Sequence, residues 1–363
     1  MKIGIITYHF AKNYGAVLQC YALQTYLLKR GYDVEIFNFI DENQKNNNDV
    51  VKHGKDLRSK IVNFCLVPFL IYIKRKHEKF ITFCKEELHL SPLFTYLYEL
   101  EDYINRNKFD VIISGSDQVL NCNINDFNKA FLYPFKTNSK KIFYAASTGN
   151  ASSEDIAKIE KYILDFSNIA IREKKDLCKF NEELHSKLEI VCDPVMLLSV
   201  NEWNNMVEKK EEKPYLLCYF LHKELFDKEF PIAKNFAQKM GLELKIINVR
   251  YGRKSFLKGT MYDVGPKEFV NLIANSDYVC TDSFHGTLFS LIFHKRFTCF
   301  DTIKNRKDTR RKGLLEEVGA LEVFYNIEEE IKICPKLDYE EIDRNIQRMR
   351  KNAEQYLEKI NEK

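Results

Sequence analysis

The turn at residues 281–287 carries the densest set of groups that could do chemistry. It combines the hydroxyls of Thr281 and Ser283, the carboxylate of Asp282 and the imidazole of His285. Histidine is the usual general acid or base near neutral pH, and a carboxylate can accept a proton from a hydroxyl group. The turn is therefore a candidate proton-transfer site, with His285 and Asp282 as its catalytic groups. A structural histidine with satisfied hydrogen bonds is the alternative interpretation of His285.

The elements on either side of this turn would place it at the edge of a sheet. Residues 278–280 have the apolar character of a short buried strand, and from Gly286 onward apolar residues recur at helical spacing. In a parallel α/β sheet, ligands bind outside the carboxyl ends of the strands. A helix N-terminus there offers backbone N–H groups and partial positive charge, which suit an anion. Ser283, Gly286 and Thr287 are accordingly predicted to contact an anionic substrate.

The first loop of the chain has a similar setting. Asn13, Tyr14 and Gly15 follow the predicted strand at 3–6 and precede a predicted helix at 17–29. The first βα loop of such sheets commonly faces the ligand. The loop contains neither G-x-G-x-x-G nor a P-loop, so the sequence supports neither a dinucleotide site nor an ATP site. A plain loop, with Gly15 at the helix start, is the alternative.

Further polar groups follow other predicted strands. Ser116, Asp117 and Gln118 follow the strand at 109–114, and Ser147 follows the strand at 141–146. Arg172 ends the strand at 168–172, where its planar fork could bind a carboxylate or phosphate. An ion pair with Glu173 or Asp193 is the alternative for Arg172.

Composition limits the class of protein. The chain has 363 residues, of which 45% are hydrophobic and 30% charged, and its net charge is +4. This balance gives no argument for nucleic acid binding. The ten cysteines are scattered without zinc-ligand spacing, so no metal is predicted and a reducing compartment is indicated. The sequence shows no signal peptide and no apolar run of about 20 residues, so a cytoplasmic protein is predicted.

Strand and helix patterns alternate in two halves, which predicts an α/β fold with two Rossmann-like domains facing a cleft. The predicted N-terminal domain is 1–200, with a helical insertion at about 41–100 whose residues 41–60 are polar and asparagine-rich. The C-terminal domain is 201–335, and 336–363 forms a charged helix that packs across both.

Residues 52–79 suggest a membrane contact. This stretch holds eight Lys or Arg residues and two acidic ones around the apolar run 61–73. A basic helical segment with an apolar centre can lie on an anionic membrane surface. An ordinary amphipathic insertion is the alternative.

The chain resembles the polysaccharide pyruvyl transferase family. The resemblance covers 1 to about 320 and rests on six motifs in the family's order: Asn13-Tyr-Gly-Ala-Val-Leu-Gln, Gly115-Ser-Asp-Gln-Val-Leu-Asn, Tyr144-Ala-Ala-Ser, Ile171-Arg-Glu, Asp193-Pro-Val-Met-Leu-Leu and Thr281-Asp-Ser-Phe-His-Gly-Thr-Leu-Phe-Ser. Two positions depart from the pattern, because Leu120 stands where relatives usually carry Trp and Phe284 differs from the better-characterised branch.

The resemblance implies a fold similar to the two-domain GT-B glycosyltransferases and the transfer of pyruvate from phosphoenolpyruvate to a sugar of a surface or exopolysaccharide, forming a ketal. No cofactor is implied. Arg172 and His285 would contact the donor, with His285 as general acid, and the C-terminal domain would be the donor side. Asp117, Gln118 and the Asn13 loop would lie nearer a glycan acceptor, which could be lipid-linked. Asp282 or Asp117 would accept the hydroxyl proton.

Two other functions are compatible with these residues. A GT-B glycosyltransferase would use a nucleotide sugar, and Glu268 or Asp263 would be the candidate carboxylate for its ribose. A non-catalytic glycan-binding or membrane-associated subunit would use segment 52–79. His294 and His9 are predicted to be structural.

Overall fold

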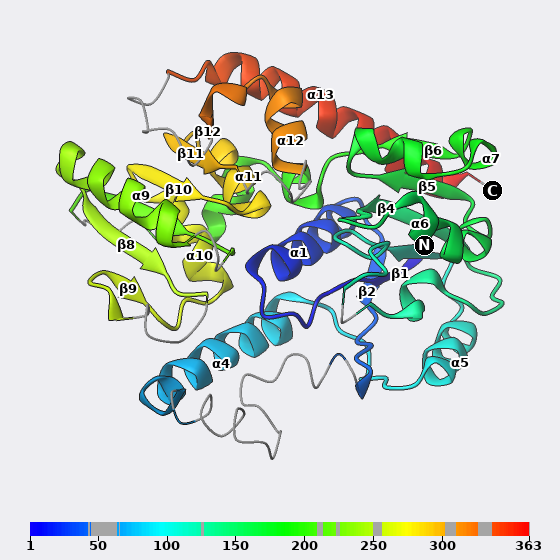
Figure 1. Ribbon diagram of the computed structural model, residues 1–363. Coiled ribbons are helices and arrows are strands. Elements are labelled where there is room, and N and C mark those ends of the chain that lie inside the picture. The colour runs from blue at the N-terminus through cyan, green and yellow to red at the C-terminus, as the bar shows by residue number, and fades with distance from the viewer. Residues whose placement is uncertain are drawn as a thin grey trace. The chain divides into compact units, whose positions relative to one another are not determined.

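The computed structural model describes residues 1–42, 44, 64, 66–124, 127–208, 213–222, 226–249, 256–301, 310–325 and 336–362 (Figure 1). Two compact units are present. Unit 1 comprises Met1–Asn48, Phe83–Leu198 and Ile346–Lys363, and unit 2 comprises Asp49–Thr82 and Ser199–Asn345. This division groups 49–82 with the second unit, whereas the sequence placed an insertion at about 41–100 in the first domain.

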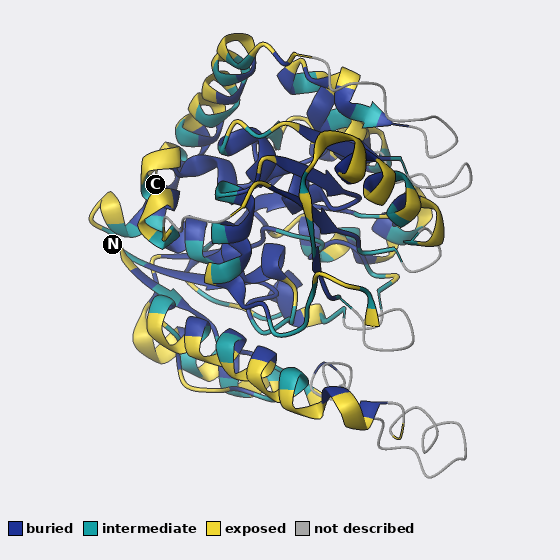
Figure 2. Cartoon of the chain, turned by 90° about the vertical axis from the view of Figure 1, so that its left-hand side faces the viewer, coloured by how far each residue is buried: buried dark blue, intermediate teal, exposed yellow. Residues whose placement is uncertain are grey.

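The core of unit 1 is a six-stranded parallel sheet in the order β2-β1-β3-β4-β5-β6. Its strands are β1 (Lys2–Ile6), β2 (Asp33–Ile36), β3 (Val111–Ser114), β4 (Lys140–Ala146), β5 (Asn168–Ile171) and β6 (Leu188–Ile190). Its helices are α1 (Tyr14–Lys29), α5 (Leu97–Asn107), α6 (Ser153–Ile163) and the short α7 (Glu182–His185). Parallel pairing requires crossovers that cover the sheet, which explains why the inner strands β1, β3, β4 and β5 are buried almost throughout (Figure 2). The edge strands β2 and β6 are only partly buried.

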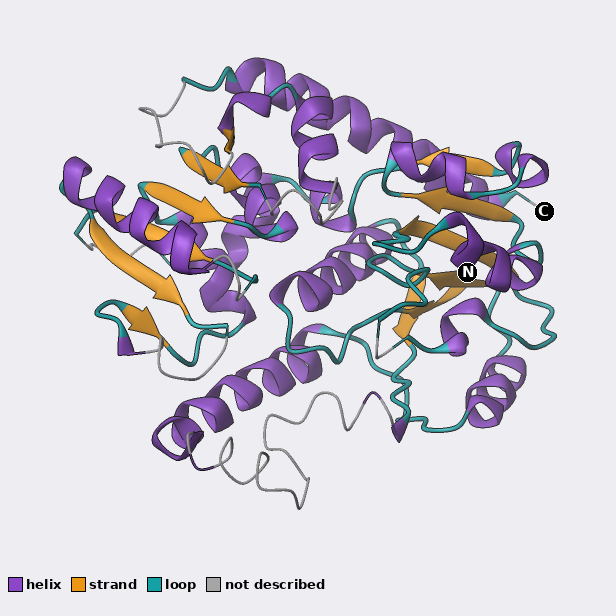
Figure 3. Cartoon of the chain, in the orientation of Figure 1, coloured by secondary structure: helices purple, strands orange, loops and turns teal. Residues whose placement is uncertain are grey.

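Unit 2 contains a second six-stranded parallel sheet in the order β12-β11-β10-β7-β8-β9. Its strands are β7 (Tyr215–Tyr219), β8 (Glu243–Ile247), β9 (Thr260–Met261), β10 (Tyr278–Thr281), β11 (Phe297–Phe300) and β12 (Phe324–Tyr325). Its helices are the short α8 (Val200–Trp203), α9 (Phe226–Met240), α10 (Pro266–Ala274), α11 (Phe284–Ile292) and α12 (Arg310–Val318). Helices flank the strands of each sheet (Figure 3).

The boundary between the two units falls within two long helices. They are α4 (Leu70–Glu87), which the boundary divides after Thr82, and α13 (Tyr339–Glu358), which it divides after Asn345. Of the polar stretch 41–60, the structure describes residues 41, 42 and 44, and in the apolar run 61–73 residues 61–63 and 65 lie outside the described part. No described helix is long and apolar enough to cross a membrane.

Two helices begin earlier than their apolar spacing predicts. The first was expected from Val17 but begins at Tyr14, because the side chain of Asn13 caps it by accepting a hydrogen bond from the Gly15 N–H at 2.9 Å. The other was expected from Gly286 but begins at Phe284, with Ser283 as its N-cap. Hydrophobic spacing reports which residues pack, whereas capping side chains set where the helix starts.

Candidate functional site

In unit 1, the first loop serves as a helix cap. Tyr14 and Gly15 are buried in the first turn of α1, and the exposed Asn13 caps it. This geometry agrees with the alternative interpretation of the loop, in which Gly15 lies at the start of the helix. A contact between Asn13 and a substrate stays a prediction.

The loop after β3 lies beside the end of β4. Ser116 is buried, and its hydroxyl donates to the Ala145 carbonyl at 3.0 Å. The backbone carbonyl of Asp117 accepts from the Ser147 N–H at 2.9 Å, which joins the two loops. Gln118 accepts from the Asn121 amide at 2.8 Å. Asp117 itself is half-buried and takes a left-handed backbone conformation with φ of 69°. The structure therefore brings Ser116, Asp117, Gln118 and Ser147 together at one edge of the sheet.

Arg172 forms two buried ion pairs within unit 1. Its Nε lies 2.8 Å from Oε1 of Glu173, and its NH1 lies 2.7 Å from Oδ2 of Asp193. At most 5% of any of these three side chains is exposed. Burial alone would lower the pKa of Arg172, but the carboxylates of Glu173, Asp193 and Asp117 outweigh it and raise the pKa. Both ion pairs of the alternative interpretation are present, so the guanidinium charge is compensated by protein carboxylates.

In unit 2, the turn after β10 is held by its own hydroxyls. Thr281 donates to the Tyr219 carbonyl at 2.7 Å and accepts from the Ser283 N–H at 3.0 Å. Ser283 accepts from the Gly286 N–H at 3.3 Å, and the Thr287 hydroxyl donates to the Ser283 carbonyl at 2.9 Å. A Cβ on Gly286 would lie 2.5 Å from Oγ1 of Thr281, so the turn needs glycine there. These four residues build the turn that presents His285.

His285 occupies the first turn of α11. It is buried, with 9% of its surface exposed, and its ring meets that of Phe284 edge-on at 5.4 Å. The residue at 284, which departs from the family pattern, is thus in contact with the proposed general acid. The start of a helix at the carboxyl end of a parallel strand is the predicted setting for His285.

Asp282 has a partner that the sequence analysis missed, His222. One Asp282 carboxylate oxygen accepts from the Leu221 N–H at 2.6 Å. The other accepts from the His222 N–H at 2.8 Å and lies 2.6 Å from His222 Nδ1. His222 follows β7, whose residue Tyr219 pairs with Thr281 of β10. The signal that could have found it is its position after a strand, because neighbouring parallel strands end at the same edge of the sheet.

A buried carboxyl group, Glu229 on α9, lies near Asp282. Glu229 is fully buried, and neither oxygen has a hydrogen-bond partner among the described residues. Burial and the Asp282 charge raise the pKa of Glu229 from 4.5 to about 9, against the opposing effect of Arg311. Arg311 is also fully buried and donates to the Phe300 carbonyl. Glu229 is therefore a neutral carboxylic acid at neutral pH.

We expect Glu229→Gln to stabilise the protein increasingly as pH rises from 5 to 8. Because the pKa is raised in the folded state, Glu229 retains a proton there that the unfolded chain releases, so wild-type stability falls as pH rises from 4.5 towards 9. Glutamine removes this dependence, so its advantage over wild type should grow by roughly 4 kcal/mol from pH 5 to pH 8. Urea unfolding at both pH values measures it, with the exposed Glu316→Gln as control. An equal gain at pH 5 and pH 8 would show that titration is not the cause.

His294, His9 and the candidate ribose carboxylate Glu268 have structural partners. Nε2 of His294 lies 2.9 Å from the Asp343 carboxylate, and its ring stacks on Tyr339. His9 is buried between Asn38 and Thr7, and burial lowers its pKa. Glu268 accepts from the Gly265 N–H at 3.1 Å and pairs with Lys79 at 2.7 Å, which makes it part of the N-terminal cap of α10. Burial lowers the pKa of Lys76 to about 8, against the opposing effect of the Asp263 charge.

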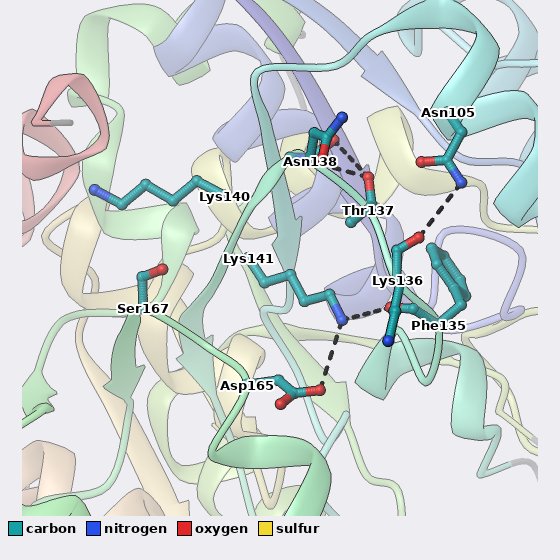
Figure 4. Close-up of a pocket in the computed structure, with 10 residues that line it drawn as sticks. Asn105, Phe135, Lys136, Thr137, Asn138, Lys140, Lys141, Asp165 and Ser167 are labelled. Atoms are coloured by element: carbon teal, nitrogen blue, oxygen red, sulfur yellow. Dashed lines mark hydrogen bonds and ion pairs between the residues drawn. The ribbon is translucent and has the colours of Figure 1, made fainter.

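A hollow of about 660 Å³ opens in unit 1 at the other edge of the sheet (Figure 4). It lies where β4 and β5 begin, lined by Lys140, Lys141 and Ser167 among others. Lys141 donates to the carbonyls of Tyr133 and Phe135 at 2.8 and 2.7 Å, so its ammonium group is already engaged. This hollow does not contain any of the predicted site residues.

No group of three or more His, Cys, Asp or Glu side chains that could hold a metal ion occurs in the described part of the chain.

The architecture is similar to that of solved UDP-N-acetylglucosamine 2-epimerases. One aligns with a TM-score of 0.55 at 8% identity, covering 99% of this chain and 94% of that one. The enzyme from Methanocaldococcus jannaschii, in complex with UDP-GlcNAc and UDP, gives 0.50 at 14% identity and covers 99% of both chains. The enzyme from Neisseria meningitidis bound to UDP-GlcNAc gives 0.50 at 10%, covering 99% and 94%. This likeness and the two parallel sheets confirm the predicted α/β fold class of two Rossmann-like, GT-B-like domains.

Comparison with family models shows the family to which this chain belongs. The model of the polysaccharide pyruvyl transferase family matches residues 13–304, which include the Asn13 loop, Arg172 and the whole turn that carries His285. Because this match spans most of the sequence, the chain belongs to the polysaccharide pyruvyl transferase family, and it is a transferase. Comparison with curated proteins found no match.

Proposed function

We propose that the protein transfers a pyruvyl group from phosphoenolpyruvate to a sugar of a surface glycan or exopolysaccharide and forms a ketal. The observation that carries this proposal is the family match over residues 13–304. The buried His285 in the first turn of α11 supports it, because the reaction needs a proton donor beside an anionic donor substrate.

His285 is the proposed general acid. It delivers a proton to the methylene carbon of the enol, which leaves an oxocarbenium-like centre for attack by a sugar hydroxyl. Phosphate leaves, and a second hydroxyl closes the ketal. The start of α11 supplies the partial positive charge for an anionic group of the donor.

Arg172 receives a different role from the one that the resemblance implies. Two nitrogens of its fork already donate to Glu173 and Asp193. We assign it to hold these carboxylates in place rather than to bind the donor. Asp117, Gln118 and Ser147, which lie together at the sheet edge, are the proposed groups for the hydroxyl-rich acceptor, since a carboxylate and neutral polar groups suit hydroxyls.

A donor screen tests the proposal. Phosphoenolpyruvate is expected to raise the melting temperature of the protein, whereas UDP-sugars and GDP-sugars leave it unchanged, because a ligand that binds only the folded state stabilises it. A shift with a nucleotide sugar and none with phosphoenolpyruvate would favour a glycosyltransferase instead.

The residues just before α4 and in its first turn form the proposed membrane contact. Phe64, Val67 and Ile71 are 79%, 57% and 56% exposed, close in sequence to the exposed Lys74 and Arg75. Exposed apolar side chains beside basic ones suit an anionic lipid surface, where a lipid-linked acceptor and a cytoplasmic enzyme would meet.

We expect the protein to float with vesicles that contain an anionic lipid and not with neutral phosphatidylcholine vesicles. Phe64→Ser with Ile71→Ser should reduce flotation at least about threefold, because the apolar contact is lost. The control is Leu321→Ser, which removes an exposed apolar side chain outside this segment. Equal flotation of the double variant and wild type would contradict this contact.

A further inference from the structure

His222 and Asp282 form a histidine–carboxylate pair at the edge of the unit 2 sheet. Asp282 follows β10, and His222 lies three residues beyond the end of the neighbouring strand β7. The pair is fixed from both sides, because the same carboxylate also accepts from the backbone N–H groups of Leu221 and His222. The imidazole is thus tied to its own backbone segment and to the turn that carries His285.

The hydrogen bond to Asp282 decides which ring nitrogen of His222 can accept a proton from a substrate. A carboxylate can only accept, so Nδ1 of His222, at 2.6 Å, is the donor to Asp282. In the neutral ring, Nε2 then keeps the lone pair and is the proton acceptor. Within the described residues, no side chain or backbone group hydrogen-bonds to Nε2.

Exposure separates the roles of the two partners. The Asp282 side chain has no exposed surface, and both of its oxygens already accept hydrogen bonds. The His222 side chain is 23% exposed. The imidazole is therefore partly open to solvent, whereas the carboxylate is closed off from it.

Three ionisable groups near the Asp282 carboxylate are neutral, so its negative charge acts mainly on the His222 imidazole. Burial, with a further contribution from the Asp282 charge, raises the pKa of Glu229, Tyr219 and Cys299, so all three are neutral near pH 7. Arg311 is the cation whose charge opposes these shifts at Glu229 and Cys299. Of the described groups that interact with Asp282, the imidazole is the one that can take up a proton from a substrate.

We propose that His222 is the catalytic base that accepts the proton of the attacking sugar hydroxyl, and that Asp282 is the residue that positions it. This role rests on the proposed function and deepens it. As the hydroxyl oxygen bonds to C2 of the donor, its proton moves to Nε2 of His222, while the proton gained by C3 comes from His285. Phosphate leaves C2 with the C–O bonding electrons when the second hydroxyl attacks. The proton of that second hydroxyl returns His285 to its acid form, and the leaving phosphate takes the proton held by His222, so atoms and charge balance.

The test compares His222→Asn with His294→Asn. Asparagine at 222 can still donate to Asp282 but has no basic nitrogen, so kcat should fall about 10²–10⁴-fold, while the thermal shift with phosphoenolpyruvate is retained. His294 also pairs with an aspartate, at 2.9 Å, but both side chains are more than 40% exposed. His294→Asn should keep wild-type kcat. Phosphate release from phosphoenolpyruvate is measured with a panel of p-nitrophenyl hexosides.

Chemical rescue distinguishes a base from a structural residue. In His222→Gly, added imidazole should raise the rate at least about tenfold over the rate without imidazole, because the partly exposed site can admit it. A His222→Asn variant with at least a third of wild-type kcat would overturn the proposal, and a concurrent loss in Asp117→Asn would move the base to Asp117. If wild type neither releases phosphate nor is stabilised by phosphoenolpyruvate, the proposed function fails and the role of His222 falls with it.

Discussion

Replacing His285 with alanine is expected to lower kcat for pyruvyl transfer by about 10²–10⁴-fold, the usual contribution of a positioned general acid. The imidazole lies in the first turn of α11, and the turn that presents it is built by Thr281, Ser283 and Gly286. No described neighbour in that turn could replace it as a proton donor near neutral pH. The stabilisation by phosphoenolpyruvate should persist, because the helix start remains.

Two controls make the His285 prediction specific. His294→Ala, on the segment that follows α11, removes an exposed imidazole and should leave kcat unchanged. Deuterium from solvent should enter the methyl group of the product in wild type, since the methyl gains one proton from a group that exchanges with water. His285→Ala with wild-type turnover would refute the role of His285 as general acid.

Replacing Arg172 with methionine is expected to destabilise the protein by about 3–5 kcal/mol. The change leaves the carboxylates of Glu173 and Asp193, both at most 5% exposed, without their shared cation. Breaking a buried ion pair from one side costs this much because the remaining charge is poorly solvated. Urea unfolding of unit 1, followed by a probe in its sheet, gives the free energy.

The matched control for Arg172 is Lys359→Met. Lys359 pairs with Glu189 at 2.6 Å, also in unit 1, but 37% and 36% of the two side chains are exposed. This substitution should cost no more than about 1 kcal/mol. If Arg172→Met keeps wild-type stability and instead weakens only the binding of phosphoenolpyruvate, Arg172 is a donor ligand, as the resemblance implies.

The alternation of apolar strands and amphipathic helices is enough to predict both parallel sheets. Parallel strands that are buried on both faces have continuous apolar runs, and these are visible at 111–113, 216–218 and 278–280. The polar residues after such runs, including Asp117 and Asp282, are predicted at the sheet edges for the same reason. Pairing order is not visible, because it depends on contacts between distant segments.

The finer composition of the site depends on those distant contacts. Asp282 and His222 are 60 residues apart, and only the pairing of β7 with β10 brings them together. Arg172 is 21 residues from Asp193, and nothing local shows that the fork would be shared by two carboxylates. Glu229 lies on the buried face of an amphipathic helix, where an acidic residue is the exception that hydrophobic periodicity cannot predict.

The most direct test of pyruvyl transfer follows the carbon atoms of the donor. The purified protein is incubated with phosphoenolpyruvate labelled with ¹³C at C3 and with the panel of p-nitrophenyl hexosides. We predict that phosphate release requires a sugar and that the label moves from an alkene methylene signal to the methyl signal of a sugar-linked ketal. Consumption of a nucleotide sugar, with the labelled phosphoenolpyruvate unchanged in the presence of every hexoside, would contradict the account.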